Sequence, residues 1–140
     1  MKETQFTPAS REERERYIID PLSDVPLTGL VEGSFSRLVA TEQMTLSFIT
    51  MKAHSVFELH THPHAQCMIV LDGYCDEVIG DKLYRVQKGD VLYLPPYTPH
   101  GAFLRSADCK ALDIFCPSRD DYVAKYQEQN GGAPRFIKLD

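Results

Sequence analysis

The sequence predicts an all-β protein, an antiparallel sandwich or barrel, with short helical segments at both ends of the chain. The main observation is that, from residue 35 onward, about eight short segments rich in Val, Ile, Leu, Tyr, Phe and Thr follow one another at even spacing. A second observation is that turn signals separate these segments, without the helical crossovers that a parallel sheet requires.

Four turn signals mark the ends of the predicted strands: LDG at 71–73, IGD at 79–81, KGD at 88–90 and the proline-rich run PPYTP at 95–99. We therefore expect strands at residues 35–40, 45–52, 66–71, 74–79, 82–86, 90–94, 101–105 and 110–115.

Both ends of the chain carry helix signals. The segment SREE at 10–13 has the capping-box pattern of a short charged helix, although a solvated arm explains the same residues equally well. Near the other end, SRDD at 118–121 predicts a helix with Ser118 as its N-cap, and GG at 131–132 predicts its end. The predicted organisation is a single domain, with an N-terminal extension at 1–34, a barrel at 35–117 and a helix and tail at 118–140.

Composition and charge exclude several classes of partner. The chain has 140 residues, a net charge of −5 and no Lys/Arg-dense run, which argues against nucleic acid as the partner. No stretch approaches the roughly 18 continuous apolar residues of a membrane span. The N-terminal stretch MKETQFTPASREERERY is too polar for a secretory signal, so we expect a cytoplasmic protein. The four cysteines lack CxxC spacing and are expected to remain thiols that pack as small buried hydrophobes, with a zinc–thiolate site as the alternative.

The stretch ELHTHPHAQC at 58–67 contains three of the five histidines. It is either a histidine-rich polar loop or part of a metal site. Side chains alternate between the faces of a strand, so His60, His62 and Gln66 can all point to one side. Pro63 interrupts the strand ladder and leaves the orientation of His64 open.

A further histidine follows in GDVLYLPPYTPH at 89–100, where a proline-stiffened bend delivers His100 from a neighbouring strand. Three imidazoles and one amide oxygen suit one divalent transition metal ion, such as Ni, Zn, Mn or Fe, and leave coordination positions open. Tyr97 lies on the same bend, where it either lines the mouth of the site or packs within the loop.

The last predicted strand contains an acidic residue in an apolar setting, within KALDIFCPSRDDY at 110–122. Asp113 and Phe115 share one face of this strand, and a carboxylate there is costly to bury unless it is paired or functional. If Asp113 faces the interior, it is a candidate general acid or base, and Arg119 could bind a substrate carboxylate. A salt bridge between Asp113 and Arg119, or a solvent-facing Asp113, explains the same spacing.

These residues resemble the two motifs of the cupin family over residues 40 to 117. The first motif, G-x₅-HxH-x₃₋₄-E-x₆-G, is matched by His60, His62, Gln66 and Gly73, and the second, G-x₅-P-x-G-x₂-H-x₃-N, by Gly89, Pro95 and His100. The resemblance implies a double-stranded β-helix, a small jelly-roll barrel with a metal inside. The chain departs from the motifs at four places: Ser55 or one of its neighbours replaces the leading glycine, Gln66 the glutamate, Tyr97 a glycine and Leu104 the asparagine.

Two stretches, HTHPHAQ at 60–66 and DIFCPSR at 113–119, are similar to the small pectin-degradation cupins that ketonise unsaturated uronates. That family converts a cyclic 4,5-unsaturated monouronate to its open-chain keto form. The resemblance implies metal ligands at His60, His62, Gln66 and His100, catalytic roles for Asp113 and Arg119, and substrate contacts at Phe115 and Arg119; Tyr97 is a further candidate contact.

Gln66 favours one use of the metal over others. A neutral glutamine in place of glutamate leaves the full divalent charge on the ion, which suits Lewis-acid chemistry. The leading function is therefore a metal-dependent lyase or isomerase that acts on a small acidic sugar. The alternatives are a metal-dependent dioxygenase acting on a small organic acid or phenol, and a non-catalytic cupin that binds a sugar or metabolite. Small jelly-roll barrels commonly pair through edge strands, so we also expect a homodimer.

Overall fold

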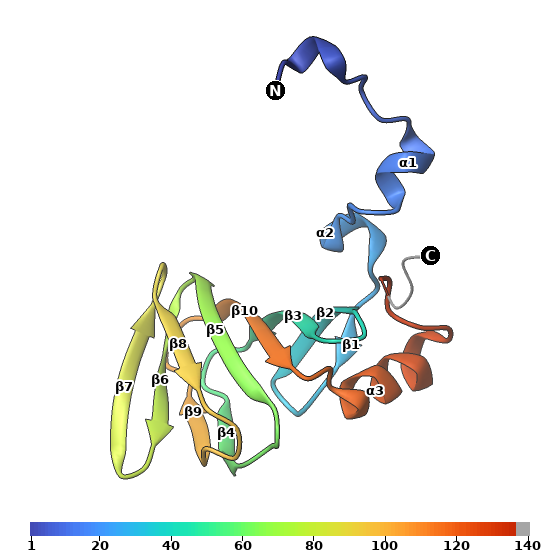
Figure 1. Cartoon of the computed structure of the whole chain (residues 1–140). Helices are drawn as coiled ribbons and strands as arrows, with labels where there is room; N and C mark the ends of the chain where they lie inside the picture. Colours follow the sequence, from blue (N-terminus) through green and yellow to red (C-terminus); the bar gives the residue numbers. More distant parts are fainter. Residues whose placement is uncertain (137–140) are drawn as a thin grey trace.

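The computed structural model describes residues 1–136, and it consists mainly of two antiparallel sheets (Figure 1). The larger sheet has the order β1-β2-β3-β10-β5-β8, and the smaller sheet has the order β4-β9-β6-β7. The larger sheet contains β1 (Thr28–Gly29), β2 (Ser34–Ala40), β3 (Thr45–Met51), β10 (Cys109–Cys116), β5 (Ala65–Asp72) and β8 (Val91–Leu94). The smaller sheet contains β4 (Val56–His60), β9 (His100–Phe103), β6 (Tyr74–Ile79) and β7 (Lys82–Gln87). The predicted all-β fold class, a jelly-roll barrel with short helices, is confirmed.

Every predicted strand is present, and the structure adds two that the sequence analysis missed. Strand β1 is two residues long and lies within the segment 1–34 that was assigned to the N-terminal extension. Strand β4 pairs only with β9, through an irregular register, and most of its side chains are exposed. A strand with one neighbour and little burial has no strong apolar alternation, which is why the pattern did not reveal it.

The interior of the barrel follows from side-chain alternation along its strands. In β3 every second residue is buried, and β10 repeats this pattern. The inward apolar side chains of both sheets form one core cluster, which includes Ile49, Met51, Met68, Val70 and Cys75. Burying each large aliphatic side chain stabilises the fold by about 1.5–3 kcal/mol. The same alternation turns the polar residues of the inner faces toward the interior.

The N-terminal segment carries three short helices and extends away from the barrel (Figure 1). They are η1 (Glu3–Gln5), α1 (Arg11–Glu15) and α2 (Pro21–Asp24). The predicted capping box of α1 is confirmed, because the Glu13 amide donates to Ser10 Oγ at 3.2 Å and the Ser10 amide donates to Glu13 Oε2 at 2.8 Å. No helix within residues 1–136 is long and apolar enough to cross a membrane.

Helix α3 (Asp120–Asn130) packs beside β1 and β2 and ends at Gly131, where the backbone turns to a positive φ of 72°. Its predicted N-cap was wrong: the N-cap is Arg119 rather than Ser118. The Ser118 hydroxyl instead lies 2.8 Å from the Thr45 hydroxyl on β3, so it ties the end of the barrel to the helix start. Only the tertiary fold brings Thr45 to this position.

All four cysteines are free thiols. Cys75 and Cys109 are fully buried and pack as small hydrophobes, as expected, whereas Cys116 is exposed and Cys67 is half-buried. The expectation of buried thiols therefore holds for two of the four.

Candidate metal centre

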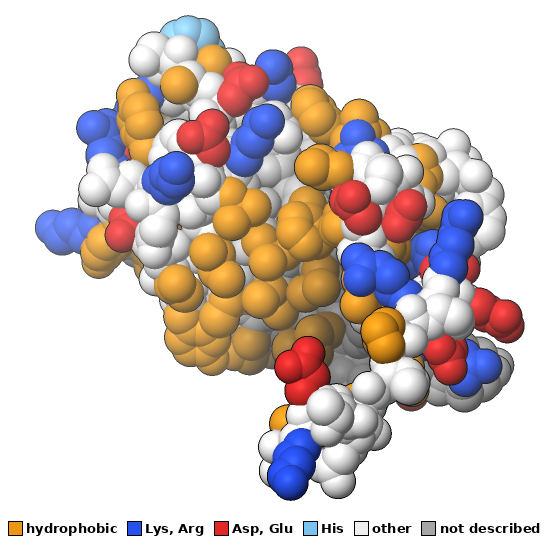
Figure 2. Space-filling model, turned by 90° about the horizontal axis from the view of Figure 1, so that it is seen from above, with side chains coloured by type: hydrophobic (Ala, Val, Ile, Leu, Met, Phe, Trp, Pro, Cys, Tyr) orange, Lys and Arg blue, Asp and Glu red, His pale blue; other side chains and the backbone are white. Residues whose placement is uncertain are grey.

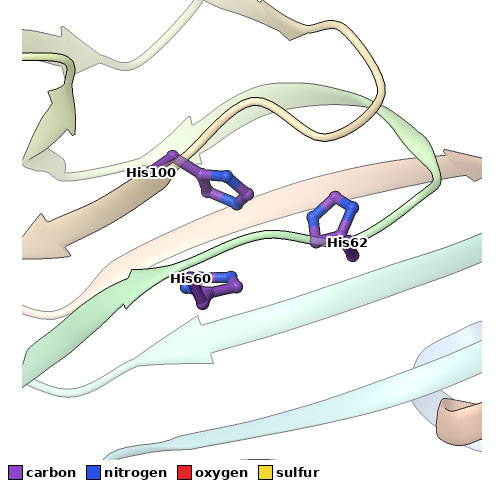
Figure 3. Close-up of side chains that lie close together, drawn as sticks. All are labelled: His60, His62 and His100. Atoms are coloured by element: carbon purple, nitrogen blue, oxygen red, sulfur yellow. The ribbon is translucent and has the colours of Figure 1, made fainter.

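Three histidines lie close together at one end of the barrel (Figure 3), with His62 and His100 buried and His60 exposed. His60 ends β4, His62 lies in the following loop, and His100 begins β9. One nitrogen from each ring lies within 4.8 Å of the others, and the ring centroids of His60 and His100 are 4.3 Å apart. His60 and His100 are also register partners of the β4–β9 pair. The cupin fold together with this group indicates a divalent metal site.

Gly101 allows the two histidine-bearing strands to approach each other. A Cβ atom at this position would lie 2.5 Å from the Phe57 carbonyl oxygen on β4, much closer than real side chains come. Glycine therefore lets β9 pack against β4 and brings His100 opposite His60.

Backbone carbonyls set the orientation of all three rings. The Nδ1 of His60, His62 and His100 lies 2.8, 3.0 and 2.8 Å from the carbonyl oxygens of Glu58, His64 and Thr98, respectively. A carbonyl only accepts, so each Nδ1 carries the proton and each Nε2 keeps its lone pair for a metal. Burial lowers the pKa of His62 and lowers the pKa of His100 to about 4, which keeps these two rings neutral at neutral pH.

Gln66 lies next to this group of histidines. Its Oε1 lies 3.1 Å from His62 Nε2, while its amide Nε2 donates to Asp113 Oδ1 at 3.1 Å. Because His62 uses its proton at Nδ1, two lone pairs face each other between Nε2 and Oε1, an arrangement that a bound cation satisfies. Three imidazole nitrogens and one amide oxygen fit a borderline divalent ion.

The reason given for this convergence was wrong, although the residues do converge. Strand parity was expected to align His60 and His62 with Gln66, as on a single strand. Instead, His60 ends a strand of the smaller sheet and Gln66 lies in β5 of the larger sheet. The donor set is assembled across the gap between the sheets, so it depends on their packing and not on one strand's alternation.

His64 does not join the group. Its side chain is half-buried. Among residues 1–136, its Nδ1 is the one buried side-chain nitrogen or oxygen without a hydrogen-bond partner. It contributes its backbone carbonyl, which orients His62.

Asp113 projects from β10 into the interior, on the same strand face as Phe115, which is one of the orientations that the sequence left open; it is only 6% exposed. Its carboxylate accepts a hydrogen bond from the Gln66 amide. Burial raises the pKa of Asp113 to about 7, so the carboxyl group exchanges a proton near neutral pH. The two alternatives for Asp113, a solvent-facing side chain and a salt bridge to Arg119, are not what the structure shows, because Asp113 is neither exposed nor ion-paired with Arg119.

Arg119 pairs with Asp121 instead. Its Nε donates to Asp121 Oδ1 at 3.0 Å and its Nη2 donates to Asp121 Oδ2 at 2.6 Å. The guanidinium carbon lies 3.8 Å from the Tyr122 ring centroid and 4.8 Å from that of Phe115. The guanidinium thus contacts both rings, which stand nearly perpendicular to each other at 82° with centroids 5.5 Å apart. Its Nη1 donates to no other described residue within 1–136.

One cavity of about 610 Å³ joins these groups. It is within the usual size range of small-molecule sites, roughly 300–1,000 Å³. Its lining includes the three histidines, Gln66, Asp113, Phe115 and Arg119. All but one of the residues singled out from the sequence therefore share one cavity.

Tyr97 is the exception. Its side chain is 67% exposed and does not line the cavity. Its backbone has a positive φ of 63° and its amide donates to the His62 carbonyl at 2.9 Å. Tyr97 replaces the glycine of the second cupin motif, and its left-handed backbone explains why glycine is favoured there. Tyr97 therefore supports the site through its backbone.

The sequence analysis missed Glu77, which lines the same cavity and is 5% exposed. Burial, and after it the charge of Asp113, raises the pKa of Glu77 to about 8. The available signal was its parity with Cys75 on the strand at 74–79, which turns an acidic side chain toward the core. The charged pair DE at 76–77 obscured this signal, because its two members face opposite sides of the sheet.

Comparisons with known proteins agree with this geometry. The cupin domain family matches residues 47–115. The structure of KdgF from Halomonas sp. matches with a TM-score of 0.64 and 25% identity, covering 69% of this chain and 90% of that chain.

Two further structures show the fold alone. An RmlC-like cupin from Shewanella frigidimarina NCIMB 400 matches with a TM-score of 0.66 and 21% identity, over 71% of this chain and 90% of that one. The polyketide cyclase RemF from Streptomyces resistomycificus matches with a TM-score of 0.61 and 17% identity, over 68% and 75% of the two chains. No curated protein sequence matches the chain. The chain belongs to the cupins, and it is a small cupin that resembles KdgF.

Proposed function

We propose that this cupin is a metal-dependent isomerase or lyase that opens a cyclic 4,5-unsaturated monouronate to its keto form. The observation that carries the proposal is the position of Asp113. Its carboxyl group is buried, is hydrogen-bonded by the Gln66 amide, and shares one cavity with the histidines and Arg119. An acid–base group, a metal-ligand group and a carboxylate-binding cation thus meet around one small volume.

The residues that would hold the metal are His60, His62, Gln66 and His100. A divalent ion such as Ni, Zn, Mn or Fe supplies Lewis-acid polarisation of substrate oxygens when bound, and the neutral glutamine leaves its charge undiminished. The three Nδ1 hydrogen bonds to backbone carbonyls fix the rings before a substrate arrives.

The proposed reaction moves one proton from oxygen to carbon. The anomeric hydroxyl loses a proton, the bond between the anomeric carbon and the ring oxygen breaks, and C4 gains a proton as C5 becomes a ketone. Atoms balance without a co-substrate. A carboxyl group whose pKa is about 7 can both accept and donate near neutral pH, which suits Asp113 for the transfer.

Arg119 and Phe115 would bind the substrate. The Arg119 guanidinium packs against the rings of Tyr122 and Phe115 and is oriented by Asp121, so its remaining edge is available to pair with the uronate carboxylate. Phe115 is almost fully buried, and its ring packs edge-on to His62 with centroids 5.6 Å apart. It offers an apolar wall for the sugar ring.

The test is an assay of turnover of unsaturated galacturonate, in which the loss of its enol-ether absorbance is measured. The chain is loaded in turn with Ni, Mn, Zn or Fe. Asp113→Asn is expected to lower kcat by about 10²- to 10⁴-fold while bound metal is retained. Asp81→Asn, in the exposed turn between β6 and β7, is the matched control. No loss of absorbance with any of these metals overturns this substrate, and full ligand affinity without turnover indicates a non-catalytic binding cupin.

One observation favours a second candidate, a metal-dependent dioxygenase acting on a small organic acid or phenol. A site with three histidines and no carboxylate ligand also suits Fe(II) with open positions. Turnover that requires both oxygen and tightly held Fe(II) would replace the isomerase proposal with this one.

We also propose a homodimer. Figure 2, a view from above Figure 1, shows hydrophobic side chains gathered over one face of the barrel. Strand β8 is an edge of the larger sheet, and its Val91 and Tyr93 are exposed together with Leu71 on β5. A second copy would cover such a surface. Light scattering at micromolar concentration should give twice the chain mass, and a monomer would contradict the proposal.

A further inference from the structure

We propose that Glu77 binds a hydroxyl group of the sugar from the inner wall of the cavity. This inference rests on the sugar substrate of the proposed function, and it adds a polar contact that neither the metal group nor Arg119 provides. Three observations carry it: the position of Glu77 on its sheet, the lack of an ion-pair partner for it within residues 1–136, and the free hydrogen-bonding capacity of its carboxyl group.

Register places Glu77 on the same sheet face as a proposed metal ligand. In the β6–β9 pair, Glu77 lies opposite Ala102 and Ile79 lies opposite His100. Glu77 is thus diagonal to His100, and such neighbours are separated by about 7–8 Å. It is not part of the three-histidine group. Asp113 projects from the other sheet, so the two carboxyl groups enter one cavity from different walls.

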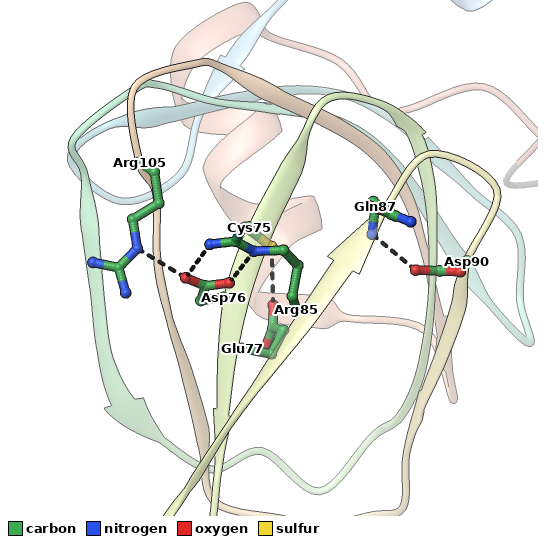
Figure 4. Close-up of polar contacts among 7 residues, drawn as sticks. All are labelled: Cys75, Asp76, Glu77, Arg85, Gln87, Asp90 and Arg105. Atoms are coloured by element: carbon green, nitrogen blue, oxygen red, sulfur yellow. Dashed lines mark hydrogen bonds and ion pairs between the residues drawn. The ribbon is translucent and has the colours of Figure 1, made fainter.

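The neighbouring residue shows how a buried carboxylate is normally satisfied (Figure 4). Asp76 faces the outside of the sheet and accepts from Arg85 at 2.8 and 3.1 Å and from Arg105 at 2.8 Å. Hydrogen bonds from these two guanidinium groups lower the pKa of Asp76 to about 2. In Figure 4, Glu77 has a single partner, the Cys75 thiol, with Sγ 3.9 Å from Oε1. A thiol is a weak donor and provides little compensation for burial.

The second oxygen of Glu77 has no hydrogen-bond partner among residues 1–136. It keeps some accessible surface, because the one fully buried side-chain polar atom without a partner in that range is Nδ1 of His64. Glu77 lines the cavity, so its carboxyl group borders space that a ligand can occupy. A buried carboxyl group without a cation destabilises a fold, and such groups persist mainly at functional sites.

The chemistry of the group matches a hydroxyl. A protonated carboxyl donates one hydrogen bond and accepts others, and a sugar hydroxyl does the same. Burial favours the protonated form of Glu77 at neutral pH, since it raises the pKa to about 8. With Arg119 on the substrate carboxylate and the metal group on other oxygens, Glu77 would supply a third fixed point. Three points define the orientation of a rigid ring.

The experiment compares wild type, Glu77→Gln, Glu77→Leu and the surface control Glu42→Leu as nickel-loaded chains. Turnover of unsaturated galacturonate gives kcat and KM, calorimetry gives the affinity for D-galacturonate, and bound nickel is measured in every chain. Glu77→Leu should raise KM and weaken the affinity by about tenfold to a hundredfold, the cost of leaving one hydroxyl unpaired. Glu77→Gln, which still donates and accepts, should stay within about fivefold of wild type. Bound nickel should not change.

The outcomes separate this inference from the proposed function. Turnover with an unchanged KM and affinity in Glu77→Leu overturns the inference and leaves the function standing. If wild type binds D-galacturonate without turnover and Glu77→Leu loses that affinity, the reaction is wrong and the inference holds. If wild type neither converts unsaturated galacturonate nor binds D-galacturonate, both the proposed function and this inference are wrong. Equal losses of affinity in Glu77→Gln and Glu77→Leu also overturn the inference, because hydrogen bonding by residue 77 would then not be the cause.

Discussion

Replacing Glu77 by glutamine should stabilise the folded chain, by an amount that grows with pH. Burial, together with the charge of Asp113, raises the pKa of Glu77 from 4.5 to about 8. The folded chain therefore keeps a proton that the unfolded chain releases above pH 4.5. Glu77 therefore does not affect the free energy of unfolding below pH 4.5, and it lowers that free energy progressively as the pH rises to about 8. Glutamine does not titrate and escapes the loss.

The magnitude follows from the two pKa values. Between them, each pH unit removes about 1.4 kcal/mol of the free energy of unfolding, because the folded state holds one more proton. At pH 5 the loss is below about 1 kcal/mol, and at pH 8 it is about 4 kcal/mol. Domains of this size are stable by roughly 5–15 kcal/mol, so the difference at pH 8 is a large fraction of the total.

Urea denaturation of the metal-free chains at pH 5 and pH 8 measures this difference. Any change in packing caused by the amide is the same at both pH values, so it cancels in the comparison. The histidines are present in both wild type and Glu77→Gln, so their contribution cancels as well. Glu42→Gln, on the surface turn between β2 and β3, should show no pH-dependent gain. If Glu77→Gln changes the stability by the same amount at both pH values, Glu77 is charged or solvated in the folded protein, and the reasoning from its burial is refuted.

Three further predictions concern the proposed metal site and its supports. Nickel at about 100 times its dissociation constant should raise the free energy of unfolding by about 2.7 kcal/mol, and His100→Ala should abolish this gain; an equal gain in the variant, measured by denaturation, would contradict the ligand set. Gly101→Ala should destabilise the chain by about 1–3 kcal/mol and reduce bound nickel, because the added Cβ would force β9 away from β4. Stability and bound nickel at wild-type values would show that the close approach of the strands is not needed. Tyr97→Gly should leave KM unchanged and shift stability by about 1 kcal/mol or less, because the exposed ring contributes nothing and the positive φ suits glycine; a raised KM would restore Tyr97 as a substrate contact.

Local rules were enough for most of the strands, because their signals lie within a few residues of each other. Alternation in β3 and β10, and the turns at Gly73 and Gly89, are properties of short segments. They failed at β4, where pairing is irregular and burial is slight. They also failed at Ser118, which bonds to a threonine 73 positions away instead of capping α3. In both cases a distant partner decided the outcome.

The candidate site divides in the same way. Motif spacing predicted His60, His62, Gln66 and His100 as metal ligands, and the structure brings the three histidines together with Gln66 beside His62. The reason for their meeting could not be obtained from strand parity, since the set bridges two sheets. The choice between a paired and a free Asp113 also needed the fold, which gives Arg119 a closer partner in Asp121.

The sequence by itself determined an all-β cupin barrel and predicted a donor set of three histidines and a glutamine, since alternation, turn residues and motif spacing are encoded locally. Only the tertiary structure decided that Glu77 is a buried acid with no ion-pair partner among residues 1–136, that Tyr97 acts through its backbone, and that one cavity joins the acidic residues to the histidines. Burial, desolvation and the distance between side chains on different sheets arise when the two sheets pack. No local pattern contains that information.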